Sequence, residues 1–356
     1  MKMDEISFLK KFVEIYSPHG EEEKASNFLH DSMRKLGLRT VKTRIGNVIG
    51  EVGCGRPKIF LCGHMDTVKG KLPVKLTQTG LYGRGAVDAK APLSAMIMAA
   101  ARFVKKPCKG SITVAAVVDE EGHSRGIRDL INTGVEADYA IFGEPSHLKN
   151  ITIGYKGCLS IHIDVKTRGG HTSSPLTNNA IEGAIKLWSE IKKDFEKYVK
   201  KSLRNSITTT ISGISNIGVS HATICLNFRY PESKDINNIR NNLTKIVEIF
   251  NKEESVKADI IEDEVCPPYT ADKKSKLVSA LQQSIKKITG EPALLITKTG
   301  TGDMNIFGNT YKTPTVTYGP GDSRLDHTVD EYIELKEYLT SIEILEDCLK
   351  TLLESG

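Results

Sequence analysis

Acids and histidines stand at the ends of the apolar runs in this chain. The polar residues at five such run ends are His64 and Asp66, Asp88, Glu120 and Glu121, Glu144, and Asp326 and His327. Four of these runs have the composition of strands, and in an open α/β sheet the carboxyl ends of the strands share one crevice. The sequence therefore predicts that two histidines and several carboxylates gather at one sheet edge, as a cage for two divalent metal ions.

The order of helix and strand patterns changes along the chain. In the first 154 residues the two patterns alternate, which predicts an α/β layer with a mostly parallel sheet. From about residue 155 the order becomes β-α-β-β-α-β with period-two strands, which is the split ferredoxin-like unit. The alternation of helix and strand patterns resumes near residue 265. We therefore expect a di-metal catalytic domain of residues 1–154 plus 265–356, interrupted by an inserted domain of residues 155–264.

Composition narrows the class of protein and its compartment. A net charge of +5 is too mild to suggest nucleic-acid binding, and the apolar stretch at 91–101 is too short to span a bilayer. The seven cysteines form no CxxC pair, which indicates free thiols in a reducing compartment. Residues 1–16 carry acids and lysines, unlike a signal peptide. We expect a cytoplasmic protein that binds neither nucleic acid nor membrane.

The residue types at the run ends suit a catalytic metal site. Zinc takes histidine nitrogen and carboxylate oxygen, and a catalytic site keeps one position open for water. Asp66 is two residues from His64 on an extended segment, where it can orient the imidazole ring. Glu120 and Glu121 are adjacent and point in different directions, so one can bind metal while the other serves as a base. Asp88 lies in a glycine-rich turn before a helix and is placed to bridge two ions.

Each of these residues also has a purely structural interpretation. His64 can be a satisfied polar group at a strand end, and adjacent glutamates commonly lie on a solvated surface. Glu144 can cap a turn before Pro145, and an Asp-His pair can cap a helix. The metal interpretation depends on the joint arrangement of these residues at successive strand ends, which is much harder to obtain by accident.

Several motifs also resemble one known family. They are Gly63-His64-Met65-Asp66-Thr67-Val68, Gly83-Arg84-Gly85-Ala86-Val87-Asp88-Ala89-Lys90, Asp119-Glu120-Glu121-Gly122, Gly143-Glu144-Pro145-Ser146, and Gly169-Gly170-His171-Thr172-Ser173-Ser174-Pro175. They look like the signature of the co-catalytic zinc amidohydrolases, the family of acetylornithine deacetylase, succinyl-diaminopimelate desuccinylase and carboxypeptidase G. The resemblance covers nearly the whole chain in the right order. The family also has the inserted β-α-β-β-α-β domain.

The resemblance implies a role for each residue of the cage. Asp88 would bridge the two metals, His64 and Glu144 would complete one site, and Glu121 and His327 would complete the other. Glu120 would be the general base, and Asp66 would be the partner that orients His64. The ions would be zinc, with cobalt or manganese equally suited to nitrogen and oxygen ligands.

The resemblance also implies residues that bind substrate. His171 resembles a histidine that reaches the active site from the other subunit, which implies a homodimer built through the inserted domain. Arg229 resembles an arginine that holds a substrate carboxylate. Gly300 and Thr301 lie in a segment that resembles the family's glycine-rich substrate loop.

Within this family the segments 86–90 and 319–328 look most like the LysK-type hydrolases. Those enzymes release lysine, and in some cases ornithine, from the C-terminal glutamate of an acidic amino-group carrier protein in lysine and arginine biosynthesis. The basic stretch at 192–204 is either a solvated helix face or a dock for such an acidic partner. The alternatives are a deacylase acting on a free small molecule, such as acetylornithine deacetylase or succinyl-diaminopimelate desuccinylase, and a metal- or carrier-binding protein without turnover.

Overall fold

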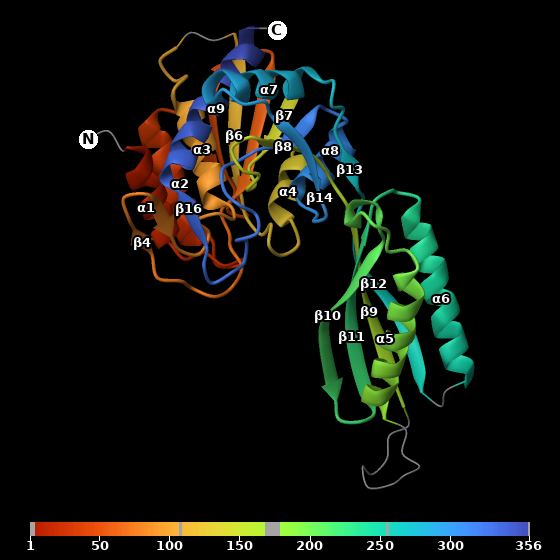
Figure 1. The fold of residues 1–356 in the computed structure, drawn as a ribbon. Coiled ribbons are helices and arrows are strands. Elements are labelled where there is room, and N and C mark those ends of the chain that lie inside the picture. Colours follow the sequence, from red (N-terminus) through yellow and green to blue (C-terminus); the bar gives the residue numbers. More distant parts are fainter. Residues whose placement is uncertain (1–3, 107–108, 168–178, 254–255, 355–356) are drawn as a thin grey trace. The chain divides into compact units, whose positions relative to one another are not determined.

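The computed structural model describes residues 4–106, 109–167, 179–253 and 256–354 (Figure 1). The chain divides into two compact units. Unit 1 comprises Met1–Gly154, Thr270–Ile296 and Gly302–Gly356, and unit 2 comprises Tyr155–Tyr269 and Thr297–Thr301. The sequence placed the second boundary after residue 264, whereas unit 2 extends to Tyr269 and takes in a short segment of the later chain.

A nine-stranded sheet forms the centre of unit 1. Its strands are β1 (Arg39–Lys42), β2 (Val48–Cys54), β3 (Lys58–His64), β6 (Gly110–Val117), β7 (Tyr139–Phe142), β8 (Asn150–Tyr155), β13 (Tyr269–Thr270), β14 (Leu294–Lys298) and β15 (Thr315–Thr317). The order is β1-β2-β6-β3-β7-β15-β8-β13, with β14 paired to β8. The four central strands β6, β3, β7 and β15 are mutually parallel, whereas β2 pairs antiparallel with both β1 and β6, and β8 pairs antiparallel with β15. The predicted mostly parallel α/β sheet is confirmed at its centre.

Helices cover both faces of this sheet. The helices of unit 1 are α1 (Glu5–Glu14), α2 (Glu23–Leu36), α3 (Lys90–Ala101), α4 (Arg125–Asn132), α7 (Lys276–Thr289), α8 (Asp303–Tyr311) and α9 (Leu335–Glu354). Strand β3 shows the two faces, because side chains alternate along a strand. A Cβ at Gly63 would meet Leu93 of α3, whereas the Phe60 ring stacks on Phe307 of α8 with the centroids 5.1 Å apart. Within the described ranges, no helix combines the length and apolar character needed to cross a membrane.

A small antiparallel sheet joins two distant parts of unit 1. Its strands are β4 (Lys75–Leu76), β5 (Gly80–Tyr82) and β16 (Tyr332–Glu334). The run that leads to Asp88 therefore lies outside the central sheet. Pairing of β5 with β16 brings the chain just before Asp88 beside the chain just after His327.

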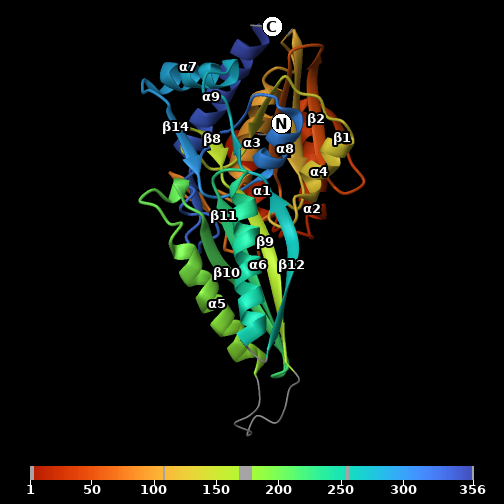
Figure 2. The same cartoon turned by 90° about the vertical axis from the view of Figure 1, so that its right-hand side faces the viewer.

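Unit 2 has the predicted β-α-β-β-α-β order. Its elements are β9 (Gly157–Lys166), α5 (Ala180–Glu196), the 3₁₀ turn η1 (Leu203–Asn205), β10 (Thr208–Ile217), β11 (His221–Tyr230), α6 (Asp235–Glu253) and β12 (Lys257–Cys266). The strands pair antiparallel in the order β10-β11-β9-β12. Both helices lie on one side of the sheet (Figure 2), where Leu187 and Leu243 are buried against alternate strand residues such as Ile163 and Leu226. The predicted ferredoxin-like insertion is confirmed.

Candidate metal centre

Four neighbouring parallel strands end at one edge of the central sheet, and polar residues follow each of them. His64 is the last residue of β3, Glu120 and Glu121 follow β6, Glu144 follows β7, and His327 lies in the loop after β15. Because the carboxyl ends of parallel strands lie at the same edge, these side chains converge. The structure thus brings together the metal-ligand candidates named from the sequence.

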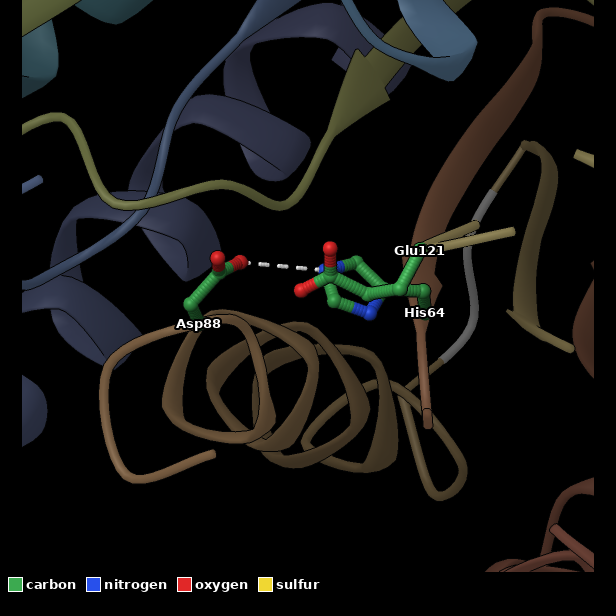
Figure 3. Close-up of side chains that lie close together, drawn as sticks. All are labelled: His64, Asp88 and Glu121. Atoms are coloured by element: carbon green, nitrogen blue, oxygen red, sulfur yellow. Dashed lines mark hydrogen bonds and ion pairs between the residues drawn. The ribbon is translucent and has the colours of Figure 1, made fainter. Parts of the chain in front are cut away.

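Asp88 lies between the two histidines. It immediately precedes Ala89, the N-cap of α3. Its Oδ1 lies 3.2 Å from Nε2 of His64, and its Oδ2 lies 3.0 Å from Nε2 of His327. Figure 3 shows the Asp88 carboxylate directed toward the His64 ring, with Glu121 close by. One carboxylate with a different histidine at each oxygen is the arrangement required of a bridging ligand.

Each histidine has a second carboxylate of its own. Oε1 of Glu144 lies 3.6 Å from Nε2 of His64, and Oε1 of Glu121 lies 2.9 Å from Nε2 of His327. The cluster therefore consists of two half-sites that share Asp88. We call the first the buried half-site, since its histidine is 1% exposed beside a Glu144 side chain that is 21% exposed. The second is the open half-site, since its histidine is 51% exposed beside a Glu121 side chain that is 9% exposed.

The geometry of the cluster fits divalent metal ions. One ligand atom from each of His64, Asp88 and Glu121 lies within 4.8 Å of the others. A tetrahedral ion with bonds of about 2.1 Å places neighbouring ligand atoms about 3.4 Å apart. The contacts of both histidines with the three carboxylates, at 2.9–3.6 Å, fall around this value. The donors are imidazole nitrogen and carboxylate oxygen, which suit zinc, cobalt and manganese.

Asp66 organises the centre in two ways. Its buried carboxylate accepts hydrogen bonds from the backbone N–H of Glu120, at 3.2 Å, and of Glu121, at 3.0 Å. Nδ1 of His64 lies 3.0 Å from the Asp66 carbonyl oxygen and 3.5 Å from Oδ1. The residue predicted to orient His64 therefore also fixes the backbone of the two adjacent glutamates.

The Glu120 carboxylate is not engaged by the groups around it. Among the described residues it forms neither an ion pair nor a hydrogen bond, whereas the neighbouring Glu121 contacts His327. Burial and the negative charges of Glu144, Asp303 and Glu121 raise its pKa well above the usual range, although the charge of His64 acts in the opposite direction. A carboxylate of raised pKa beside a metal-ligand cluster is suited to move a proton.

Asp303 is a further carboxylate close to the metal centre, and we did not identify it from the sequence. It begins α8, its side chain is buried, and neither of its carboxylate oxygens forms a hydrogen bond of good geometry. Burial, reinforced by the charges of Glu144 and Asp66, raises the pKa of Asp303 to about 7, although the side chain of Ser124 and the charge of His64 act in the opposite direction. The signal was present in the sequence, because Asp303 follows the glycine-rich segment 300–302 just as Asp88 follows a glycine-rich turn.

The candidate substrate residues lie in unit 2. Arg229 is half-buried on β11, on the sheet face away from α5 and α6, because the alternate residues of β11 form the core. A second positive charge, that of Lys156, is close to Arg229. Burial and the charge of Arg229 lower the pKa of Lys156. The Thr301 hydroxyl donates to the Lys156 carbonyl at 2.9 Å, and Gly300 is exposed beside it. His171 lies outside the described residues.

Metal binding at this centre is expected to release protons. Hydrogen bonds to Asp88 and Glu121 raise the pKa of His327 to about 10 in the metal-free protein, so the ring is protonated at pH 8. Coordination requires the neutral imidazole, and a bound proton therefore competes with the metal. We expect release of at least one proton per chain at pH 8, and an apparent metal affinity that increases with pH until pH exceeds about 10. Calorimetric titration in two buffers of different ionisation enthalpy measures this release; equal heats in the two buffers would contradict it.

The chain is similar to known proteins over nearly its whole length. The model of a family described as "Peptidase family M20/M25/M40" matches residues 60–351. The chain is 36% identical to a provisionally named LysW-lysine/LysW-ornithine hydrolase of Pyrococcus abyssi, with 99% of this chain and 95% of the relative covered. It is 35% identical to the LysW-lysine/LysW-ornithine hydrolase of Sulfurisphaera tokodaii, with 96% and 95% covered. Among solved structures, a tripeptidase from Staphylococcus aureus superposes with a TM-score of 0.83 at 22% identity, covering 99% of each chain.

Proposed function

The chain belongs to the M20/M25/M40 peptidase family and is a hydrolase, and we propose that it releases lysine, ornithine or both from an acidic amino-group carrier protein. The bond cleaved is the amide between the C-terminal glutamate of the carrier and the amino acid. The observation that carries the proposal is the similarity to LysW-lysine/LysW-ornithine hydrolases, which extends over nearly the full length of both chains. In this role the enzyme acts in the cytoplasm, at the last step of carrier-protein lysine and arginine biosynthesis.

The activity depends on two divalent metal ions, with zinc as the first candidate and cobalt as the second. Support comes from Asp88, whose two oxygens face two different histidines. His64 and Glu144 would hold one ion together with Asp88, and His327 and Glu121 would hold the other. When bound, such ions polarise a scissile carbonyl and lower the pKa of a water molecule from about 15.7 towards 7.

Glu120 would act as the general base and then as the general acid. Its carboxylate takes a proton from the attacking water as the carbon–oxygen bond forms. It then delivers the proton to the amide nitrogen as the carbon–nitrogen bond breaks, so that lysine leaves as a neutral amine. The unengaged carboxylate and its raised pKa support this role. Asp66 holds the backbone of Glu120 and so limits where that carboxylate can move.

Residues of unit 2 would bind the substrate and the second subunit. Arg229 would hold the carboxylate of the lysine or ornithine part, because a guanidinium binds a carboxylate in bidentate fashion. Gly300 and Thr301 would line the substrate loop. A homodimer through unit 2 is supported by the edge strand β10, which exposes Ile211, Ile214 and Ile217, since an exposed apolar edge strand is a template for strand pairing. Sedimentation of the intact chain tests that association.

The substrate assignment is tested by comparing two assays of the metal-loaded protein. We expect release of lysine or ornithine from the acylated carrier protein, with a much lower kcat/KM for release of acetate from N-acetylornithine. The carrier lacking its C-terminal amino acid is the control for background release. Preference for N-acetylornithine would instead show that the protein is a small-molecule deacylase. If protein with two bound metals has neither activity, the remaining alternative is a metal- or carrier-binding protein without turnover.

A further inference from the structure

We propose that the buried ion pair of Arg84 and Glu331 is a positioning device that holds His327 at the metal centre. It thereby sets the affinity of the open half-site, formed by His327, Glu121 and Asp88, without affecting the buried half-site of His64 and Glu144. This inference rests on the two-metal part of the proposed function. Neither Arg84 nor Glu331 is a ligand candidate, and both are buried, with 7% and 1% of their side-chain surface exposed.

Glu331 is bound to the turn that carries Asp88. Its Oε1 accepts hydrogen bonds from the backbone N–H groups of Val87, at 3.0 Å, and of Asp88, at 3.1 Å. Its backbone carbonyl accepts a further hydrogen bond from the N–H of Gly83, at 3.1 Å. One side chain thus fixes the backbone of the bridging residue, although the two residues are 243 positions apart in the sequence.

Arg84 connects this arrangement to the residue that follows His327. Nη1 of Arg84 donates to Oε2 of Glu331, at 2.8 Å, and to the carbonyl of Thr328, at 3.0 Å. Its Nε donates to the carbonyl of Gly70, at 3.0 Å. Hydrogen bonds therefore connect Asp88 through Glu331 and Arg84 to Thr328, and Thr328 is joined to His327 by their peptide bond. These contacts fix the Asp88 turn against the His327 loop, and the Asp88 and His327 side chains meet at 3.0 Å.

The two histidines differ in how much support they need. His64 ends a buried strand of the central sheet and is held at Nδ1 by Asp66. His327 lies between β15 and β16, in a segment without helix or strand, and its backbone has a φ of 63°. Left-handed backbone is uncommon for a residue other than glycine, so surrounding contacts must hold it. The hydrogen bond of Arg84 to the next carbonyl supplies such a contact, and for this reason the effect should be confined to the His327 half-site.

The charges of the pair point to positioning rather than to stability. Replacing a buried ion pair by uncharged groups of similar volume is frequently neutral for stability, because the cost of desolvating the two charges is removed with their attraction. What uncharged groups cannot reproduce is the set of directed hydrogen bonds from one guanidinium to Glu331, Thr328 and Gly70. Partners that orient metal ligands commonly change metal affinity by about 10–100-fold when they are mutated.

The test is a stepwise metal titration of the double variant Arg84→Met/Glu331→Gln. The glutamine keeps a carbonyl oxygen for the N–H groups of Val87 and Asp88, whereas the link to Thr328 is lost. We expect the dissociation constant of the weaker metal to rise about 10–100-fold, while the tighter metal binds as in the unmodified protein. Titration with zinc or cobalt, followed by calorimetry and by metal analysis after dialysis, measures both steps without reference to activity.

A matched variant controls for the loss of an ion pair in itself. Arg102 and Glu346 form a partly exposed ion pair of similar length, 2.6 Å between Nη1 and Oε2, with Glu5 and Lys106 as further partners. The pair is remote from the ligand candidates in sequence, so Arg102→Met/Glu346→Gln should leave both titration steps unchanged. Arg84→Lys is the conservative variant and should show a smaller change than the double variant, because the charge remains and one of the directed hydrogen bonds is lost. It also keeps the test available if the double variant does not fold.

The outcomes separate this inference from the proposed function. If the unmodified protein does not bind two ions, the two-metal proposal fails. If it binds two ions and the folded double variant does too, with unchanged affinities, the pair is only structural and the inference is wrong. Equal weakening of both steps would also overturn it, because the pair would then act through Asp88 on both half-sites rather than through His327.

Discussion

Replacing Glu120 by glutamine is expected to lower kcat by about 10²–10⁴-fold, the usual contribution of a positioned general base, while both metal ions remain bound. Glutamine has nearly the same shape but cannot take a proton from water. The backbone N–H of residue 120 would still donate to Asp66, so the adjacent Glu121 should keep its contact with His327. The change removes the proton carrier and leaves the ligand cluster in place.

The measurement combines single-turnover kinetics with metal analysis of the same sample. Glu343→Gln, an exposed position on α9, provides the matched control and should retain full activity. Full turnover of Glu120→Gln with two bound ions would show that another group takes the proton. In that case Asp303 would become the next candidate, because its carboxylate is buried, forms no hydrogen bond of good geometry and has a pKa raised to about 7.

Replacing Asp88 by alanine is expected to reduce bound metal from two ions to fewer than one per chain and to abolish turnover. The substitution removes both oxygens that face the histidines and so takes a ligand from each half-site at once. No other described carboxylate approaches both His64 and His327 within 4.0 Å, so no side chain can take over the bridge without moving. The loss should therefore exceed that caused by a change at Glu144 or Glu121, each of which serves one half-site.

Metal content after dialysis and the thermal midpoint with and without added zinc measure this effect. Unmodified protein should gain stability from the metal by mass action, and Asp88→Ala should show little of that gain. Asp88→Asn keeps one carbonyl oxygen and should retain one weakly bound ion. Asp31→Ala, at an exposed position of α2, is the control. Two tightly bound ions in Asp88→Ala would exclude Asp88 as the bridge.

The position of the centre was predictable because strand direction and chain polarity decide where strand ends meet. His64, Glu121 and Glu144 follow parallel strands, and such strands must end at one sheet edge once they are paired. His327 was harder to place from patterning alone, since nine residues separate it from β15. Whether these residues bind metal remains a prediction, because their convergence does not identify an ion.

Two other parts of the site were not recognised from the sequence, one because its helix has a weak pattern and one because it joins distant residues. Helix α8 has no clear apolar stripe and includes Gly308 and Asn309, residues with weak helix preference, so the segment after Gly302 did not indicate a helix. Asp303 was therefore not recognised as part of the centre. The connection of Arg84 with Glu331 joins residues 247 positions apart, and no periodicity can reveal a contact of that range.

The insertion of unit 2 has a consequence for the order in which the protein can mature during synthesis. Strand β15 lies between β7 and β8 in the sheet, yet it is made after the whole of β9–β12. While the ribosome is still translating the inserted unit, the edge of β7 that later pairs with β15 is open. Of the five predicted ligands, the nascent chain then contains His64, Asp88, Glu121 and Glu144. Domains generally fold as units from the N-terminus onward, so a half-formed centre exists before the last predicted ligand, His327, emerges. Delivery of the full metal complement would then be a late event, tied to release of the C-terminal segment from the ribosome.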